Sequence, residues 1–115
     1  MPVEFPSPVE FISAVNINPS NELNRLNQAE IDLPFFRRYV NALEDGGFDY
    51  TLTAYASPFQ DQFAIANQIV ARSERVTPII ALRPNTIYPT VAAKALATLD
   101  QFGVGRARLR KLSNL

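Results

Sequence analysis

Apolar residues along the chain alternate between short runs typical of strands and longer stretches with helical spacing. The expected strands lie at about residues 10–17, 50–56 and 77–83, and the expected helices at about 33–45, 58–72 and 89–102. A fourth strand is expected to begin near Arg106. Strands that alternate with helices in this way form a parallel sheet with right-handed crossovers. The pattern leaves a doubly wound sheet and a (β/α)8 barrel open as alternatives.

The ends of the expected helices carry recognisable capping residues. Asp32 with Pro34 two residues later predicts the start of the first helix, and Gly46-Gly47 predicts its end, because glycine tolerates the left-handed conformation of a C-cap. Residues 57–60, Ser-Pro-Phe-Gln, match a capping box, which places Asp61 in the first turn of the second helix. The helix residues expected to be buried are Phe36, Tyr39, Val40, Leu43, Phe63, Ala66, Ile69, Val70, Ala92, Ala95, Leu96 and Leu99.

Composition narrows the possible chemistry. The chain has 115 residues, 47% of them hydrophobic, and its 11 basic and 11 acidic residues balance, so no nucleic-acid or membrane partner is indicated. The chain has neither Cys nor His, which excludes thiol catalysis, iron–sulfur ligation and Ser-His-Asp chemistry. The first expected strand is not followed by G-x-G-x-x-G, and no phosphate-binding G-x-x-x-x-G-K-[ST] motif occurs.

The N-terminal segment gives no sign of export. Residues 1–8 carry three prolines and one glutamate, are expected to be flexible, and lack the features of a signal peptide. No apolar run approaches the roughly 20 residues of a membrane span. A cytoplasmic protein is therefore expected.

Residues 81–106, ALRPNTIYPTVAAKALATLDQFGVGR, carry the most specific signal. They resemble the third strand and third helix of the bacterial luciferase-like flavin-dependent monooxygenases, nearest to the alkanesulfonate monooxygenase branch. The matching positions are Ala81, Arg83, Pro84, Pro89, Thr90, Ala92, Ala93, Lys94, Ala97, Thr98, Leu99, Asp100, Gly105 and Arg106. Residues 35–49 and 55–63 resemble the first helix of the family and the loop and helix after its second strand.

The resemblance implies that residues 9–106 form the N-terminal part of a (β/α)8 TIM barrel, its first three βα units. It implies reduced FMN as the cofactor, a flavin reductase as a partner and a small organic substrate such as an alkanesulfonate. The family's phosphate-binding loops and catalytic positions come from later strands. In this chain the resemblance therefore implies only an edge contact to the flavin, from Tyr55, Leu82 and Arg83, and no catalytic residue.

Several of these residues have a structural alternative. Arg83 could pair with a sulfonate or phosphate, or form an ion pair that fixes the following loop. Tyr55 could contact the flavin ring or have no such role, and Ser57 is expected to cap its helix. Asp100 and Arg106 are expected to form a structural pair on the N-terminal side of the barrel, the face that serves stability.

The chain departs from the family pattern in two places. Residues 107–115, ARLRKLSNL, form a basic tail where the family has an apolar fourth strand. Arg108, Arg110 and Lys111 cannot all lie in a strand buried on both faces. The tail suggests a shifted reading frame, an altered splice end or an authentic short form. Phe59 occupies a position where the sulfonate branch often has a Cys.

Three functional hypotheses follow. The chain is a truncated flavin monooxygenase that is inactive alone, or an interaction protein that pairs with another chain or with itself through open sheet edges. The third hypothesis is a small flavin-binding module of another class.

Overall fold

The computed structural model describes residues 9–17, 19, 30–54, 60–83 and 86–111, and it confirms the alternation of strands and helices. The elements are β1 (Ile12–Ala14), α1 (Leu33–Asp45), β2 (Tyr50–Thr53), α2 (Gln62–Ala71), β3 (Thr77–Leu82), α3 (Pro89–Phe102) and β4 (Arg108–Lys111). None of the helices in this part of the chain is long and apolar enough to cross a lipid bilayer.

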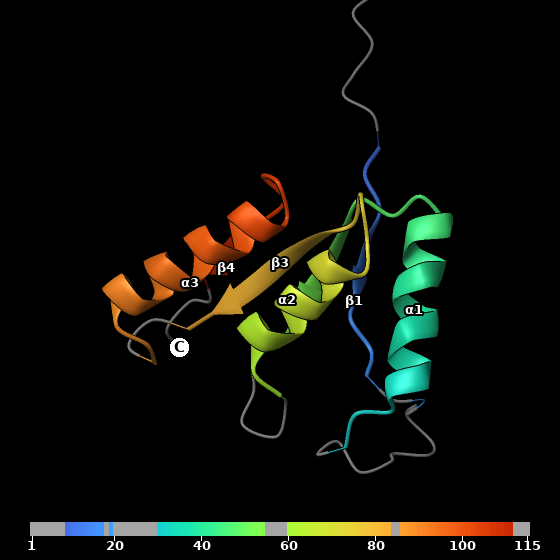
Figure 1. Ribbon diagram of the computed structural model, residues 1–115, viewed down its shortest axis with the longest axis horizontal. Helices are drawn as coiled ribbons and strands as arrows, with labels where there is room; N and C mark the ends of the chain where they lie inside the picture. The colour runs from blue at the N-terminus through green and yellow to red at the C-terminus, as the bar shows by residue number, and fades with distance from the viewer. Residues whose placement is uncertain (1–8, 18, 20–29, 55–59, 84–85, 112–115) are drawn as a thin grey trace, which may run out of the picture.

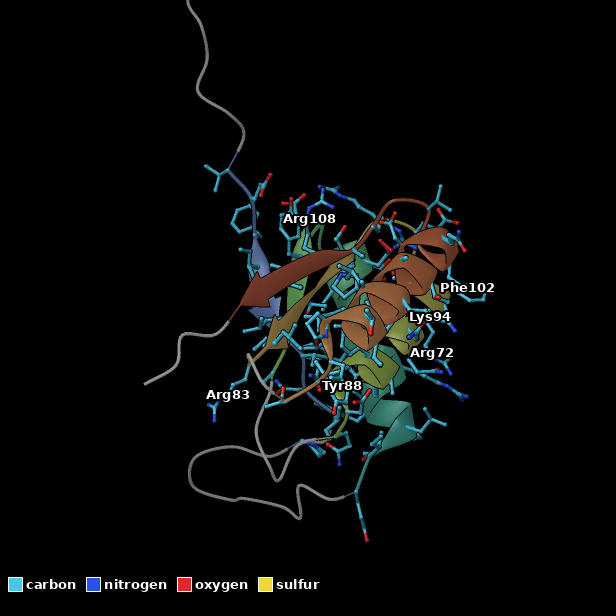
Figure 2. All side chains as sticks on the ribbon, turned by 90° about the vertical axis from the view of Figure 1, so that its left-hand side faces the viewer. Arg72, Arg83, Tyr88, Lys94, Phe102 and Arg108 are labelled. Atoms are coloured by element: carbon cyan, nitrogen blue, oxygen red, sulfur yellow. The ribbon has the colours of Figure 1, made fainter. Side chains whose placement is uncertain are left out.

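All four strands are parallel and follow the order β1-β2-β3-β4 (Figure 1). Because every crossover is right-handed and leads to the next strand along, each helix must fall on the same face of the sheet. Figure 2 shows this arrangement, with the strands on one side and the three helices on the other. A doubly wound sheet would carry helices on both faces. The arrangement is that of a segment of a (β/α)8 barrel.

The two faces of the sheet differ in burial. The residues on the helix side of the central strands are buried: Thr51, Thr53, Pro78 and Ile80. On the opposite face Tyr50, Leu52 and Ile79 are half-buried and Ile12 on the β1 edge is 58% exposed, although Thr77 and Ala81 of β3 are buried there. This second face corresponds to the interior of a closed barrel, and we call it the inner face.

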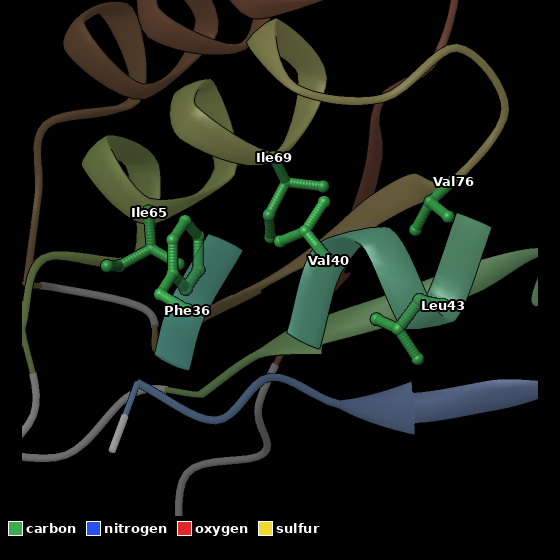
Figure 3. Close-up of a cluster of buried hydrophobic side chains, with 6 residues drawn as sticks. All are labelled: Phe36, Val40, Leu43, Ile65, Ile69 and Val76. Carbon is green, nitrogen blue, oxygen red and sulfur yellow. The ribbon is translucent and has the colours of Figure 1, made fainter. Parts of the chain in front are cut away.

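Two clusters of buried side chains join the helices to the sheet. One joins α1, α2 and the residue before β3 through Phe36, Val40, Leu43, Ile65, Ile69 and Val76 (Figure 3). The other joins α2, β3 and α3 through Phe63, Ala66, Val70, Ile80 and Leu99. The predicted faces of the first two helices are therefore confirmed. In α3 only Leu99 is fully buried, whereas Ala92, Ala95 and Leu96 remain partly exposed.

The start of α1 is confirmed and the start of α2 is corrected. The Asp32 carboxylate accepts a hydrogen bond from the Phe35 N–H at 3.0 Å, and Gly47 takes a positive φ of 74° after the helix end. Helix α2 begins at Gln62 instead of near residue 58, and its N-cap is Asp61, which accepts from the Ala64 N–H at 2.8 Å. The prediction that this helix begins near residue 58 is therefore wrong, and Ser57, the residue predicted to cap it, lies outside the described residues.

Arg106 connects three elements at the N-terminal end of the sheet. Its guanidinium donates to the Val70 and Ser73 carbonyls and the Ser73 hydroxyl at the end of α2, at 2.9 to 3.2 Å. It also donates to the Val76 carbonyl before β3 and the Gly103 carbonyl after α3. A cation therefore satisfies carbonyls that the end of a helix leaves unpaired.

The expected pair between Asp100 and Arg106 does not form. Gly105 N–H donates to the Asp100 backbone carbonyl at 2.9 Å, and the Asp100 side chain is exposed. The guanidinium of Arg106 is directed instead toward the end of α2. The difference follows from burial, because the carbonyls around the partly buried guanidinium need donors, whereas the exposed Asp100 carboxylate is solvated by water.

Glu44, at the end of α1, supports the same region from the other side. Its carboxylate accepts hydrogen bonds from the backbone N–H groups of Glu74, Arg75 and Val76 at 2.8 to 3.2 Å. The Glu44 carboxylate thus accepts hydrogen bonds from the N–H groups of the α2–β3 turn, while Arg106 donates hydrogen bonds to carbonyls of the same turn.

Part of the basic tail is a strand. Strand β4 begins two residues after the expected Arg106, and its Arg108 lies beside Ile79 of β3. The strand is at the edge of the sheet, and Arg108 is exposed there. An edge position accommodates the charge that a strand buried on both faces would not.

We expect Arg106→Met to lower the free energy of unfolding by about 2–3 kcal/mol, because the variant leaves several partly buried carbonyls without a donor. Urea denaturation of the purified chain measures this loss. Lys94→Met, which removes an exposed cation from α3, is the matched control and should change stability by less than about 0.5 kcal/mol. Equal effects of the two substitutions would contradict the role assigned to Arg106.

A second prediction concerns acid stability. The Arg75 guanidinium, which donates to the Asp49 carboxylate at 2.9 Å, and the Phe11 N–H hold the pKa of Asp49 below its ordinary value. A carboxyl whose pKa is lower in the folded state stabilises the fold above its ordinary pKa, and this contribution is lost as the pH falls through the folded value. Asp49→Asn should therefore show a smaller loss of stability than the wild type between about pH 5 and pH 3.

The measurement is the urea midpoint as a function of pH. Asp45→Asn, at an exposed position near the end of α1, is the control and should follow the wild-type curve. A parallel pH dependence of Asp49→Asn and wild type would show that this carboxyl does not contribute.

Candidate functional site

The predicted site lies at the edge of the sheet where the parallel strands end. The C-terminal ends of β1, β2 and β3 fall on the same edge, and in barrel enzymes this edge carries the active site. The described residues there are 15–17 after β1, Ala54 after β2 and Arg83 after β3.

Leu82 is the last residue of β3, and its side chain faces the helices. It is half-buried and packs against the cluster that contains Phe63, Ile80 and Leu99. The adjacent strand positions Ala81 and Arg83 alternate to the inner face. Of Leu82, only the backbone is therefore placed toward a ligand inside the barrel.

Arg83 is exposed and lies beyond the end of β3 (Figure 2). Its backbone carbonyl accepts hydrogen bonds from the Thr86 hydroxyl at 2.6 Å and from the Thr86 N–H at 3.4 Å. This turn holds the backbone of Arg83 where β3 leaves the sheet. An Arg side chain at this position can reach an anion that binds above the strand ends.

Thr86 was not singled out from the sequence, although a signal exists. It stands three residues after Arg83, a spacing at which a Thr hydroxyl bonds the backbone in a local turn. The interaction fixes the backbone of the loop that carries Arg83, so Thr86 is a positioning residue for the site.

The remaining predicted residue of the site falls outside the described part of the chain. Tyr55 lies there, as do Ser57 and Phe59, so the contact expected of Tyr55 stays a prediction. Just before this segment, the Thr53 hydroxyl donates to the Ile79 carbonyl at 3.3 Å. Thr53 is 1% exposed, and its hydroxyl links β2 to β3.

At this edge the side chain of Arg83 and the backbone beside Ala54 are among the groups that could contact a ligand. They contain no group of three acidic side chains that could hold a metal ion. A flavin phosphate carries about two negative charges and is bound by converging backbone N–H groups or several Arg side chains. The edge formed by Ala54 and Arg83 does not supply that set. The described residues at this edge therefore do not by themselves fit a complete flavin nucleotide.

Asp49, whose pKa is lowered by its hydrogen bonds from Arg75 and the Phe11 N–H, lies at the opposite end of the molecule. Asp49 precedes β2 at the N-terminal side of the sheet, where it binds Arg75 and the Phe11 N–H. In barrels this side contributes to stability and the other side to catalysis. Asp49 therefore belongs to the scaffold, together with Glu44 and Arg106.

Three solved structures share this arrangement of strands and helices. EDTA monooxygenase from Chelativorans sp. BNC1 superimposes with a TM-score of 0.74 at 20% identity, over 91% of this chain and 28% of that chain. DmoA from Hyphomicrobium sulfonivorans superimposes with a TM-score of 0.71 at 19% identity, over 93% of this chain and 28% of that chain. Coenzyme F420-dependent tetrahydromethanopterin reductase from Methanopyrus kandleri superimposes with a TM-score of 0.68 at 19% identity, over 91% of this chain and 27% of that chain.

These likenesses show the fold, and they show that the chain spans little more than a quarter of the length of each neighbour. The sequence itself shows the family. The model of the luciferase-like monooxygenases matches residues 15–110, which includes β2, β3, all three helices and the start of β4. This protein therefore belongs to the luciferase-like monooxygenase family.

Proposed function

We propose that this chain forms one wall of the flavin site of an FMN-dependent monooxygenase that acts on small anionic organic substrates. The observation that carries the proposal is the position of Arg83, exposed at the C-terminal edge of a barrel-type parallel sheet and held there by Thr86. Family membership supports a flavin as the cofactor, and a flavin reductase as the partner that supplies it in reduced form.

The substrate class follows from the charge of Arg83. A guanidinium binds sulfonate, carboxylate or phosphate oxygens in a bidentate geometry. Residues 81–106 resemble the alkanesulfonate branch, and the neighbour named for EDTA acts on a molecule with several carboxylates. Both comparisons favour an anionic substrate near the end of β3.

One wall is only part of a flavin pocket, so we propose that the 115-residue chain alone is inactive. It covers 28% of the length of the EDTA monooxygenase chain. In barrels the phosphate site usually follows the seventh and eighth strands. The chemistry of a flavin, activation of oxygen, requires a pocket that excludes water and orients the cofactor. Backbone groups near Leu82 and the side chain of Arg83 supply only part of such a pocket.

The gene provides a direct test of this reading. Coding sequence for the rest of the barrel in another frame just after Arg106 would identify the 115-residue chain as a truncated monooxygenase. A downstream sequence with no trace of further βα units would contradict truncation and favour a non-catalytic interaction protein.

We expect FMN to bind the purified chain with a dissociation constant in the high-micromolar range or weaker. Each tenfold change in affinity corresponds to about 1.4 kcal/mol of binding free energy. The loss of the contacts to the flavin phosphate therefore lowers the affinity by several factors of ten. Quenching of flavin fluorescence during a titration measures the affinity. Arg83→Ala should weaken whatever binding is present, whereas Arg38→Ala, on the exposed side of α1, should not. Saturation at low-micromolar protein would contradict the prediction.

We also expect no substrate-dependent oxygen consumption by the chain with reduced FMN and a reductase. Free reduced flavin reacts with oxygen by itself, so the rate must be compared with flavin and reductase alone. Alkanesulfonates and small carboxylates are the probes, and sulfite release is a second readout for the sulfonates. Turnover above the flavin background would show that this chain holds a sufficient active site.

A further inference from the structure

Tyr88, at the start of α3, has a side chain that the described part of the fold does not use. It occupies the N-cap position, where its backbone carbonyl accepts a hydrogen bond from the Ala92 N–H at 3.0 Å. Its side chain makes no capping hydrogen bond, and the residue is 80% exposed. Figure 2 shows Tyr88 at the C-terminal end of the sheet, the end at which Arg83 lies. An aromatic ring is therefore exposed at the edge that carries the candidate site.

The backbone on both sides of Tyr88 is held in place. Ile87, the residue before it, packs against the buried cluster that joins α2, β3 and α3. Pro89, the residue after it, has a restricted φ and begins the helix. A packed side chain and a helix thus fix the position from which the exposed ring extends.

Tyrosine is an unfavourable residue for this position in terms of stability alone. Ser, Thr, Asp and Asn are preferred at an N-cap because their short side chains accept a hydrogen bond from the first turn of the helix. The side chain of Tyr88 supplies no such bond, and its exposed ring gains little stabilisation from burial. Departures from local sequence preference are expected at functional sites, where a contact to a ligand outweighs a small loss of stability.

We propose that Tyr88 binds the aromatic part of a substrate whose anionic group binds Arg83, so that the site selects aromatic sulfonates or carboxylates over alkyl ones. This inference rests on the proposed function, because it requires Arg83 to bind the substrate anion. Tyrosine rings bind other rings in offset-stacked or edge-to-face geometry. Ligand sites combine such aromatic walls with a few charged groups that fix the orientation of the ligand. Arg83 and Tyr88 supply one group of each kind.

The loop between β3 and α3 brings the two groups to the same edge. Arg83 follows the last residue of β3, and Tyr88 precedes the first residue of α3. The Thr86 hydroxyl donates to the Arg83 carbonyl at 2.6 Å, so the chain turns directly after the strand. Both side chains are long and exposed, and both extend from backbone that is held by local contacts. One ligand at this edge can therefore contact both.

A flavin ring is the other aromatic group that this edge could meet. In barrels the phosphate of a bound ligand usually lies after the seventh and eighth strands, so we assign the anion beside β3 to the substrate. The ring that Tyr88 binds then belongs to the same molecule as that anion. Lumiflavin, which has the flavin ring and no phosphate, distinguishes the two assignments.

The first experiment is an NMR titration of the 115-residue chain with two sulfonates. Benzenesulfonate should bind about three- to tenfold more tightly than methanesulfonate, because a contact between two aromatic rings contributes a factor of this size. Arg83→Ala should weaken the binding of both. Equal affinities that both depend on Arg83 would overturn the role of Tyr88 and leave the proposed anion site in place. No Arg83-dependent binding of either sulfonate would overturn the anion site and this inference together.

Tyr88→Ser separates binding from folding. Serine is a favoured N-cap, so the variant should have a higher urea midpoint than the wild type while it loses the preference for benzenesulfonate. Tyr88→Phe, which keeps the ring, should retain the preference. A lower urea midpoint for Tyr88→Ser, or a preference that survives in it, would overturn the proposal.

Phe102→Ser is the matched control, because it removes an exposed ring from the opposite end of α3 (Figure 2). It should leave the affinities for both sulfonates unchanged. A loss of the preference in Phe102→Ser equal to that in Tyr88→Ser would show that the ring of Tyr88 has no specific role.

Lumiflavin tests the class of ligand. The wild-type chain should bind lumiflavin more weakly than benzenesulfonate, because lumiflavin lacks the anionic group that Arg83 binds. Tighter binding of lumiflavin that is lost in Tyr88→Ser would assign Tyr88 to the flavin and overturn the proposed substrate class.

Discussion

The α2–β3 turn is the point on which the rest of this structure depends, because its polar backbone is satisfied by two opposite charges. The Glu44 carboxylate accepts the N–H groups of residues 74–76, and the Arg106 guanidinium binds carbonyls of Val70, Ser73 and Val76. Buried or partly buried backbone groups are costly when unpaired, so these two side chains fix where α2 ends and β3 begins. Since they come from α1 and the α3–β4 loop, they also hold the outer helices to the centre of the sheet.

This arrangement distinguishes the two ends of the sheet. The charged networks of Glu44, Asp49 and Arg106 all lie at the N-terminal end of the strands. At the C-terminal end the Thr86 hydroxyl donates to the Arg83 carbonyl, and the Thr53 hydroxyl joins β2 to β3 by donating to the Ile79 carbonyl. Barrel enzymes show the same division between stability and function. Arg83 is therefore carried by a rigid strand while its side chain remains exposed.

Local sequence signals predicted the fold better than they predicted contacts. The Asp32 cap, the Gly47 turn and the apolar faces of α1 and α2 each depend on residues a few positions apart, and all were confirmed. The cap of α2 was misplaced because Ser57 and Asp61 both satisfy the local pattern, and only the observed helix start separates them. Apart from Gly103, the partners of Arg106 lie 30 to 36 residues earlier in the chain, a separation at which side-chain pairing leaves no periodic signal.

The direction of Leu82 illustrates the same limit at the candidate site. Residues 76–82 are almost uniformly apolar, as expected for a strand of a parallel sheet, so the sequence does not reveal which side chains face the helices. The structure resolves the alternation, with Ile80 and Leu82 toward the helices and Ala81 and Arg83 toward the inner face. This alternation also connects the site to the basic strand, because Arg83 and Arg108 both belong to the inner-face set. Whatever strands complete the barrel must therefore meet a charged side chain at each end of this face, and that constrains the partner more strongly than the apolar residues between them.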